Sequence, residues 1–197
     1  MPSSSRIAER TRGWWQDLQP TKTNGEPNPS GDRAALARLR RAAGPAEALA
    51  EEATLALFRR LGLSSEDYFR LPRVASIAVV LAHVRADTEP GADGFRAPAA
   101  RAVGRISAED ADSAKMSPLR FRRLLACREE EELAREMRRL VALADGKINV
   151  GDLAASLFFW GEKVRQRWAF EYYAAGAAAP RPDESLAEPS TAQPLPV

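Results

Sequence analysis

The sequence predicts an all-helical fold, and three observations carry this prediction. Apolar residues recur at three- and four-residue spacing along the 197-residue chain, and the alternation expected of strands is hard to find. Alanine accounts for about a fifth of the residues. Hydrophobic residues make up 45% of the chain, which is enough for one sizeable core or two small ones. We therefore expect a helical bundle, either as a single unit or as two small helical lobes.

The first expected helix covers residues 5–18, and the stretch 19–31, with three prolines and two glycines, is a loop. Asp32 stands where an N-cap belongs, and Gly44-Pro45 ends the helix that follows it. Further helices are expected over residues 46–61, 73–85, 94–105, 118–127, 129–144 and 150–175. This helical domain spans residues 1–176. The proline-rich tail 177–197 is poor in large apolar residues, so we expect it to be disordered.

Residues 86–93, with the sequence ADTEPGAD, allow two interpretations. They could mark the boundary between two helical lobes, or they could form an exposed loop within one bundle. Both interpretations require the same Pro, Gly and acidic composition, so the sequence does not decide between them.

The composition excludes several classes of protein. A net charge of +2 argues against a histone-like basic protein and against an acidic tail protein. With one cysteine, Cys127, and one histidine, His83, the chain can form neither an internal disulfide nor a His/Cys metal cluster. No apolar run is long enough for a membrane span or a signal peptide, so we expect a soluble, non-exported, cytoplasmic protein without membrane contact.

Catalytic motifs are missing from the sequence, which contains no GxxxxGK, GxGxxG, HExxH or nucleophile elbow. We therefore expect no enzyme activity, no cofactor and no catalytic or structural metal. His83 lies in an apolar helical segment and is interpreted as an interior or boundary histidine. The aromatic residues at 14–15, 158–160 and 168–173 recur at helical spacing and are interpreted as core side chains rather than base-stacking platforms.

The small net charge hides a segregation of charge along the chain. Residues 33–46, 94–108 and 113–128 contain basic residues but no acid, and together they carry +12. The rest of the chain must therefore sum to about −10. Such local concentration of one sign is what an anion-binding surface requires.

Helical geometry allows these arginines to share surfaces. At roughly 100° per residue, Arg33, Arg40 and Arg41 fall within an arc of about 100° beside an apolar stripe. In the helix expected over 118–127, the side opposite the apolar residues carries Arg120, Arg122 and Arg123. In the next helix, Arg135 has Glu131 four residues earlier as an expected partner, whereas Arg138 has no acid within helical reach.

These patterns leave three interpretations open. A single arginine on a helix face is most often solvated or half of a weak ion pair. Three acid-free clusters together favour nucleic-acid binding, because the forked donors of arginine suit phosphate oxygens. The alternative is a structural helical scaffold whose arginines dock acidic protein partners. A helix-turn-helix regulator is disfavoured because we find no convincing tight turn.

The motifs LRRAAG (39–44), FRAPAARAVGR (95–105), SPLRFRRLL (117–125), MRRLVALAD (137–145) and INVGDLAASLFFWGEKVRQRWAFEYY (148–173) occur in this order. In this arrangement the chain resembles the CasB family, the small subunit of the type I-E CRISPR surveillance complex called Cascade. The resemblance implies an all-helical, non-catalytic protein of antiviral defence that works as a homodimer among other Cascade subunits. It further implies a basic face along guide RNA and target DNA that helps hold the displaced strand of the R-loop.

The resemblance also implies site residues. Positions matching the family's basic residues are Arg40, Arg41, Arg101, Arg120, Arg138, Arg139 and Arg165. The charge pattern adds Arg33, Arg105 and Arg123. The predicted nucleic-acid-binding set is therefore Arg33, Arg40, Arg41, Arg101, Arg105, Arg120, Arg123, Arg138, Arg139 and Arg165.

Overall fold

The computed structural model describes residues 3–21, 26–29, 31–105 and 111–173, and it confirms the all-helical prediction. The predicted tail 177–197 lies outside the described residues. The α-helices are α1 (Ser4–Leu18), α2 (Arg33–Arg41), α3 (Pro45–Ala48), α4 (Glu52–Arg60), α5 (Leu71–Leu81), α6 (Pro118–Ala126), α7 (Glu130–Leu143), α8 (Val150–Phe158) and α9 (Glu162–Tyr173). The connections between them contain the 3-10 helices η1 (Ser65–Arg70), η2 (Ala99–Ala102) and η3 (Ala111–Ser113).

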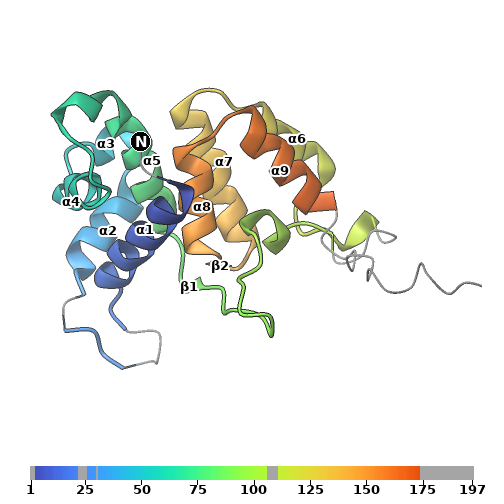
Figure 1. Ribbon diagram of the computed structural model, residues 1–197, viewed down its shortest axis with the longest axis horizontal. Helices are drawn as coiled ribbons and strands as arrows, with labels where there is room; N and C mark the ends of the chain where they lie inside the picture. The colour runs from blue at the N-terminus through green and yellow to red at the C-terminus, as the bar shows by residue number, and fades with distance from the viewer. Residues whose placement is uncertain (1–2, 22–25, 30, 106–110, 174–197) are drawn as a thin grey trace, which may run out of the picture.

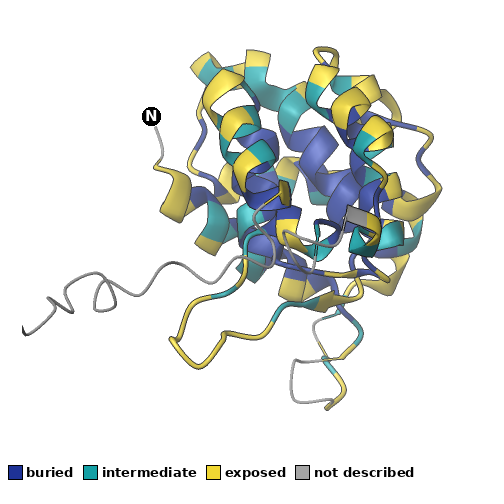
Figure 2. Cartoon of the chain, turned by 90° about the vertical axis from the view of Figure 1, so that its right-hand side faces the viewer, coloured by how far each residue is buried: buried dark blue, intermediate teal, exposed yellow. Residues whose placement is uncertain are grey.

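Two helices, α5 and α8, form the centre of the molecule. Every residue from Val74 to Leu81 in α5 is buried, and α8 is buried along its whole length apart from Asp152. Helix α1 packs on α8, whereas α3, α4 and α7 pack around α5 (Figure 1). The buried side chains form a hydrophobic core that includes residues from both sides of the 86–93 stretch (Figure 2). The division into lobes at 86–93 stays a prediction.

Capping side chains mark the first turn of two helices. The carboxylate of Asp32 accepts the backbone N–H of Ala35 at 2.8 Å, which confirms Asp32 as the N-cap of α2. Asn149 caps α8 in the same way, through the N–H of Asp152 at 3.0 Å. These caps fix where the two helices begin.

Four predicted helices differ in the structure. The helix expected over 73–85 ends at Leu81, the last residue of α5. The helix expected over 46–61 is divided into α3 and α4 at residues 49–51. The helix expected over 94–105 is wrong apart from η2, because Gly94 has a φ of +78° and Pro98 is extended. The helix expected over 150–175 breaks at residues 159–161, where the buried Trp160 donates its indole N–H to the carbonyl of Cys127 at 3.2 Å.

The chain also contains a short pair of β-strands that the spacing of apolar residues did not predict. Strand β1 (Ala86–Asp87) runs parallel to β2 (Lys147–Ile148), with Ala86 opposite Lys147. The turn before β2 has Asp145 and Gly146 at positive φ. This pairing places the segment after α5 beside the α7–α8 turn. Within the described part of the chain, no helix combines the length and apolarity needed to cross a bilayer.

Candidate nucleic-acid interface

Helix α2 presents its arginines beside a shallow apolar groove. Its inner side is buried through Ala35, Leu36 and Leu39. Arg33, Arg40 and Arg41 are exposed and line the groove together with Pro20, Thr21, Leu36 and Ala37. The fourth arginine, Arg38, instead pairs with Glu51 at 2.7 Å. The predicted grouping of Arg33, Arg40 and Arg41 therefore agrees with the structure.

Two arginines donate hydrogen bonds to backbone carbonyl groups at the ends of helices. Arg40 donates from Nε to the carbonyl of Ala82 at 2.7 Å, which ties α2 to the end of α5. Arg138 of α7 donates to the carbonyls of Ala42, at 3.0 Å, and Ala43 just after α2. A guanidinium at a helix C-terminus also interacts favourably with the helix dipole. Arg138, which has no partner on its own helix, thus serves the fold across a distance of 96 positions in sequence.

His83 lies at the boundary of the core, near enough to Arg40 and Arg138 for their charges to act on it, and no hydrogen bond to its buried Nε2 is found among the described residues. Partial burial lowers the pKa of the imidazole, and the positive charges of Arg138 and Arg40 lower it further. The histidine is therefore neutral near pH 7. We call the surface formed by Arg33, Arg40, Arg41, His83, Arg138 and Arg139 the α2–α7 region.

The neighbouring arginines of α7 lie close to an acidic side chain. Arg139 pairs with Glu136 one turn earlier, although its side chain is 64% exposed. Arg135 lies 4.0 Å from the same carboxylate rather than beside Glu131, so the predicted Arg135–Glu131 pair is wrong. Glu131 instead accepts the backbone N–H of Ala46 at 3.1 Å, at the start of α3.

Helix α6 carries several exposed arginines. Phe121 and Leu124 are buried as predicted, and Arg120, Arg122 and Arg123 are exposed. Within the described residues, the guanidinium groups of these three arginines have no ion pair or hydrogen bond. Arg165 of α9 donates to the carbonyl of Leu125 at 3.4 Å, which fastens α9 to the end of α6.

The segment around η2 adds basic side chains beside α6. Arg105 lies with its guanidinium carbon 5.2 Å from the ring centre of Tyr173, and this ring contacts Phe121 of α6 edge-on at 6.3 Å. Arg101 shares a shallow depression with Lys115 and Lys147, in which Lys115 pairs with Asp145 at 2.7 Å. We call Arg101, Arg105, Lys115, Arg120, Arg123 and Arg165 the α6–η2 region.

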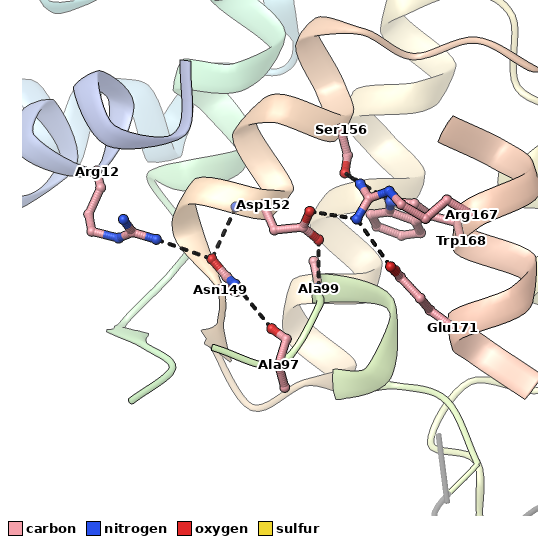
Figure 3. A network of polar contacts seen from close by, with 9 residues as sticks. All are labelled: Arg12, Ala97, Ala99, Asn149, Asp152, Ser156, Arg167, Trp168 and Glu171. Carbon is pink, nitrogen blue, oxygen red and sulfur yellow. Dashed lines mark hydrogen bonds and ion pairs between the residues drawn. The ribbon is translucent and has the colours of Figure 1, made fainter. Parts of the chain in front are cut away.

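A polar network holds η2 in place (Figure 3). Asp152 of α8 accepts the N–H of Ala99, the first residue of η2, at 2.8 Å and the guanidinium of Arg167 at 2.7 Å. Arg167 also contacts Glu171 and the hydroxyl of Ser156, which in turn accepts the indole N–H of Trp168 at 2.9 Å. Burial raises the pKa of Glu171, and Arg167 opposes this effect. The network therefore fixes where Arg101 is presented.

Some residues near these surfaces differ from the sequence interpretation. Phe170 is 71% exposed and Tyr173 is 41% exposed, so the interpretation of all these aromatics as core is wrong for both. Trp14, Trp15, Trp168 and Tyr172 are buried as predicted. Lys147 was missed, because a lone lysine after a turn gives no charge cluster in the sequence. Cys127 is buried, and burial raises the pKa of its thiol to about 11.

The fold and the exposed arginines define a class of protein, an all-helical protein with clusters of exposed arginines on its surface. Among the described residues, no group of three His, Cys, Asp or Glu side chains is arranged to hold a metal ion. Over residues 35–173 the sequence matches the family described as CRISPR-associated protein Cse2, and the chain belongs to this family. This match confirms the resemblance to the CasB small subunit.

One similar solved chain occurs in the crystal structure of E. coli Cascade bound to a PAM-containing dsDNA target. The alignment has a TM-score of 0.59 and 18% sequence identity, and it covers 86% of this chain and 95% of that chain. At this identity the likeness shows a shared fold. Comparison with curated protein sequences gave no match.

Proposed function

We propose that this protein is a non-catalytic, nucleic-acid-binding subunit of a Cascade-type CRISPR surveillance complex in the cytoplasm. It grips the backbone of guide RNA or target DNA with its basic surfaces and so stabilises the R-loop. Support comes from membership in the Cse2 family and from the DNA-bound Cascade that contains the similar chain. The observation that carries the proposal is the set of exposed α6 arginines without partners among the described residues.

The proposed mechanism is electrostatic and does not depend on sequence. Guide pairing reads the target sequence in such complexes, and the heteroduplex formed is about as stable as the duplex opened. A subunit that contacts phosphates therefore has to shift only a near-balanced equilibrium. Guanidinium groups suit this role because each neutralised phosphate releases counterions. Two copies of the chain, packed as a homodimer, would continue the basic surface along the nucleic acid.

The isolated chain tests this proposal against the scaffold alternative. Its affinity for nonspecific single-stranded and duplex DNA is measured by fluorescence anisotropy over a salt series. A nucleic-acid-binding subunit shows binding that falls steeply with salt, with a log–log slope of about −0.9 per duplex phosphate contact. A scaffold whose arginines dock acidic proteins shows no binding even at low salt, and that result would contradict the proposal.

A further inference from the structure

The connection between β1 and η2, residues 88–98, extends away from the helical body (Figures 1 and 2). We call it the β1–η2 loop. Its tip is closed by hydrogen bonds from the N–H of Gly91 to the carbonyl of Phe95, at 2.7 Å, and from the N–H of Gly94 to the carbonyl of Gly91, at 2.9 Å. Asp93 accepts the N–H of Phe95 at 2.9 Å. These bonds give the tip a defined conformation.

The base of the loop is fastened to the body by a three-membered ion cluster. Asp87 pairs with Arg12 of α1 at 2.8 Å and lies 3.4 Å from Arg96. Arg96 also donates to the carbonyl of Thr88 at 2.7 Å, across the base of the loop. The Nε of Arg96 is thus engaged within the protein by Asp87 and the carbonyl of Thr88.

Phe95 lies on this fastened loop with its side chain 75% exposed. Beside it is a shallow depression, which the small residues Ser4, Ser5, Ala8, Gly94 and Ala155 line together with the polar and charged side chains Arg12, Arg96, Asn149 and Asp152. An exposed aromatic ring at the edge of such a depression has the form of an interface anchor, since aromatic side chains that become buried on binding carry much of the energy of protein interfaces.

The charges around Phe95 identify the kind of partner. Glu89 and Asp93 are exposed on the loop, and the two nearby arginines, Arg12 and Arg96, are committed to Asp87. The outer surface of the loop is therefore acidic, which disfavours a phosphate backbone. It favours a protein surface that combines apolar and basic side chains.

We infer that the β1–η2 loop docks this chain onto another protein subunit of its complex. Phe95 packs against an apolar side chain of that subunit, whose lysines or arginines face Glu89 and Asp93. The identity of the complex rests on the proposed function, whereas the docking surface itself rests on the loop. The acidic loop and the basic surfaces would thus separate protein contact from nucleic-acid contact.

The test compares Phe95→Ala with Phe170→Ala, which removes the same side chain from a 71% exposed position on α9. Each variant is co-expressed with the other subunits and guide RNA, and the share of this chain that copurifies is measured. We expect Phe95→Ala to lower that share at least about tenfold, and Phe95→Leu to restore most of it. Phe170→Ala should copurify like the unmodified chain. Equal copurification of both alanine variants would overturn the inference.

Three further readouts separate this inference from its alternatives. Glu89→Lys should weaken copurification as well, because it places a positive charge opposite basic partner residues. Reduced self-association of isolated Phe95→Ala with normal copurification would instead indicate a second copy as the occupant. Normal copurification with weaker binding to a single-stranded oligonucleotide would indicate base stacking. Either result overturns the inference. If the unmodified isolated chain binds no DNA, the proposed function fails while the copurification result still stands.

Discussion

The two basic regions use arginine in different ways. In the α2–α7 region, Arg40 and Arg138 donate to backbone carbonyls, and Arg139 pairs with Glu136. In the α6–η2 region, Arg120 and Arg123 are exposed and hold no other side chain among the described residues. Arg40 and Arg138 therefore stabilise the fold, whereas the α6 arginines make no hydrogen bond or ion pair with the rest of the described chain. Substitutions should separate the two roles.

The largest expected effect is on nucleic-acid binding by α6. Replacing Arg120 and Arg123 together by glutamate should weaken DNA binding by about 100-fold or more at low salt, and should reduce the salt slope by about 2, one phosphate for each arginine. The melting temperature should change by less than about 4 °C, because within the described part of the chain neither guanidinium makes a hydrogen bond or ion pair. Anisotropy titrations and thermal unfolding measure both quantities.

A charge-matched control for this variant is the Arg6→Glu, Arg59→Glu pair, because both arginines are exposed on α1 and α4 and lie outside the two basic regions. This control should leave the salt slope close to that of the unmodified chain. Equal loss of affinity in the control and in the α6 variant would show that net charge, rather than the α6 surface, governs binding.

The next effect concerns Arg138, where the two roles combine. Arg138→Ala removes the donors to Ala42 and Ala43, so the free energy of unfolding should fall by about 1.5 to 3 kcal/mol. DNA binding should weaken as well. Urea denaturation checks the first effect. Arg138→Lys keeps the positive charge but loses the paired donors of the guanidinium, so it should recover DNA binding more than stability. Unchanged stability of the alanine variant would remove the distinction between the regions.

A smaller effect depends on pH through His83. Its pKa is lowered in the folded protein, so the unfolded chain binds the proton first, and stability should fall as the pH decreases below about 6.5. Phosphate near Arg40 and Arg138 would offset their charges and raise the pKa of His83. Affinity for DNA should therefore rise by less than about tenfold between pH 7 and 5.5, and His83→Gln should remove this rise. An identical pH profile in the glutamine variant would contradict the location of His83 within the binding surface.

The smallest effect is expected at Arg139. Arg139 is 64% exposed, and Arg135 lies 4.0 Å from the same Glu136 carboxylate, so Arg139→Ala should change the free energy of unfolding by less than about 1 kcal/mol. Chemical denaturation of this variant beside Arg138→Ala compares two adjacent arginines of α7. Comparable destabilisation by both would mean that the carbonyl contacts of Arg138 have no special weight.

The sequence predicted those features that depend on local chemistry. Asp32 as an N-cap, the buried side of α6 and the outward grouping of Arg33, Arg40 and Arg41 all follow from side-chain type and helical spacing. The partners of Arg138 and Arg40 did not follow, because they lie 96 and 42 positions away in the chain. The break before α9 was also missed, since it depends on Trp160 reaching the carbonyl of Cys127.

R-loop retention by the assembled complex tests the central claim most directly. Complexes carrying the unmodified chain or the Arg120→Glu, Arg123→Glu variant are compared at equal subunit occupancy, and the dissociation rate of target DNA is measured across a salt series. The account predicts faster dissociation of the variant complex and a salt dependence reduced by about two phosphates per copy of the chain. Identical dissociation rates and salt slopes would contradict it.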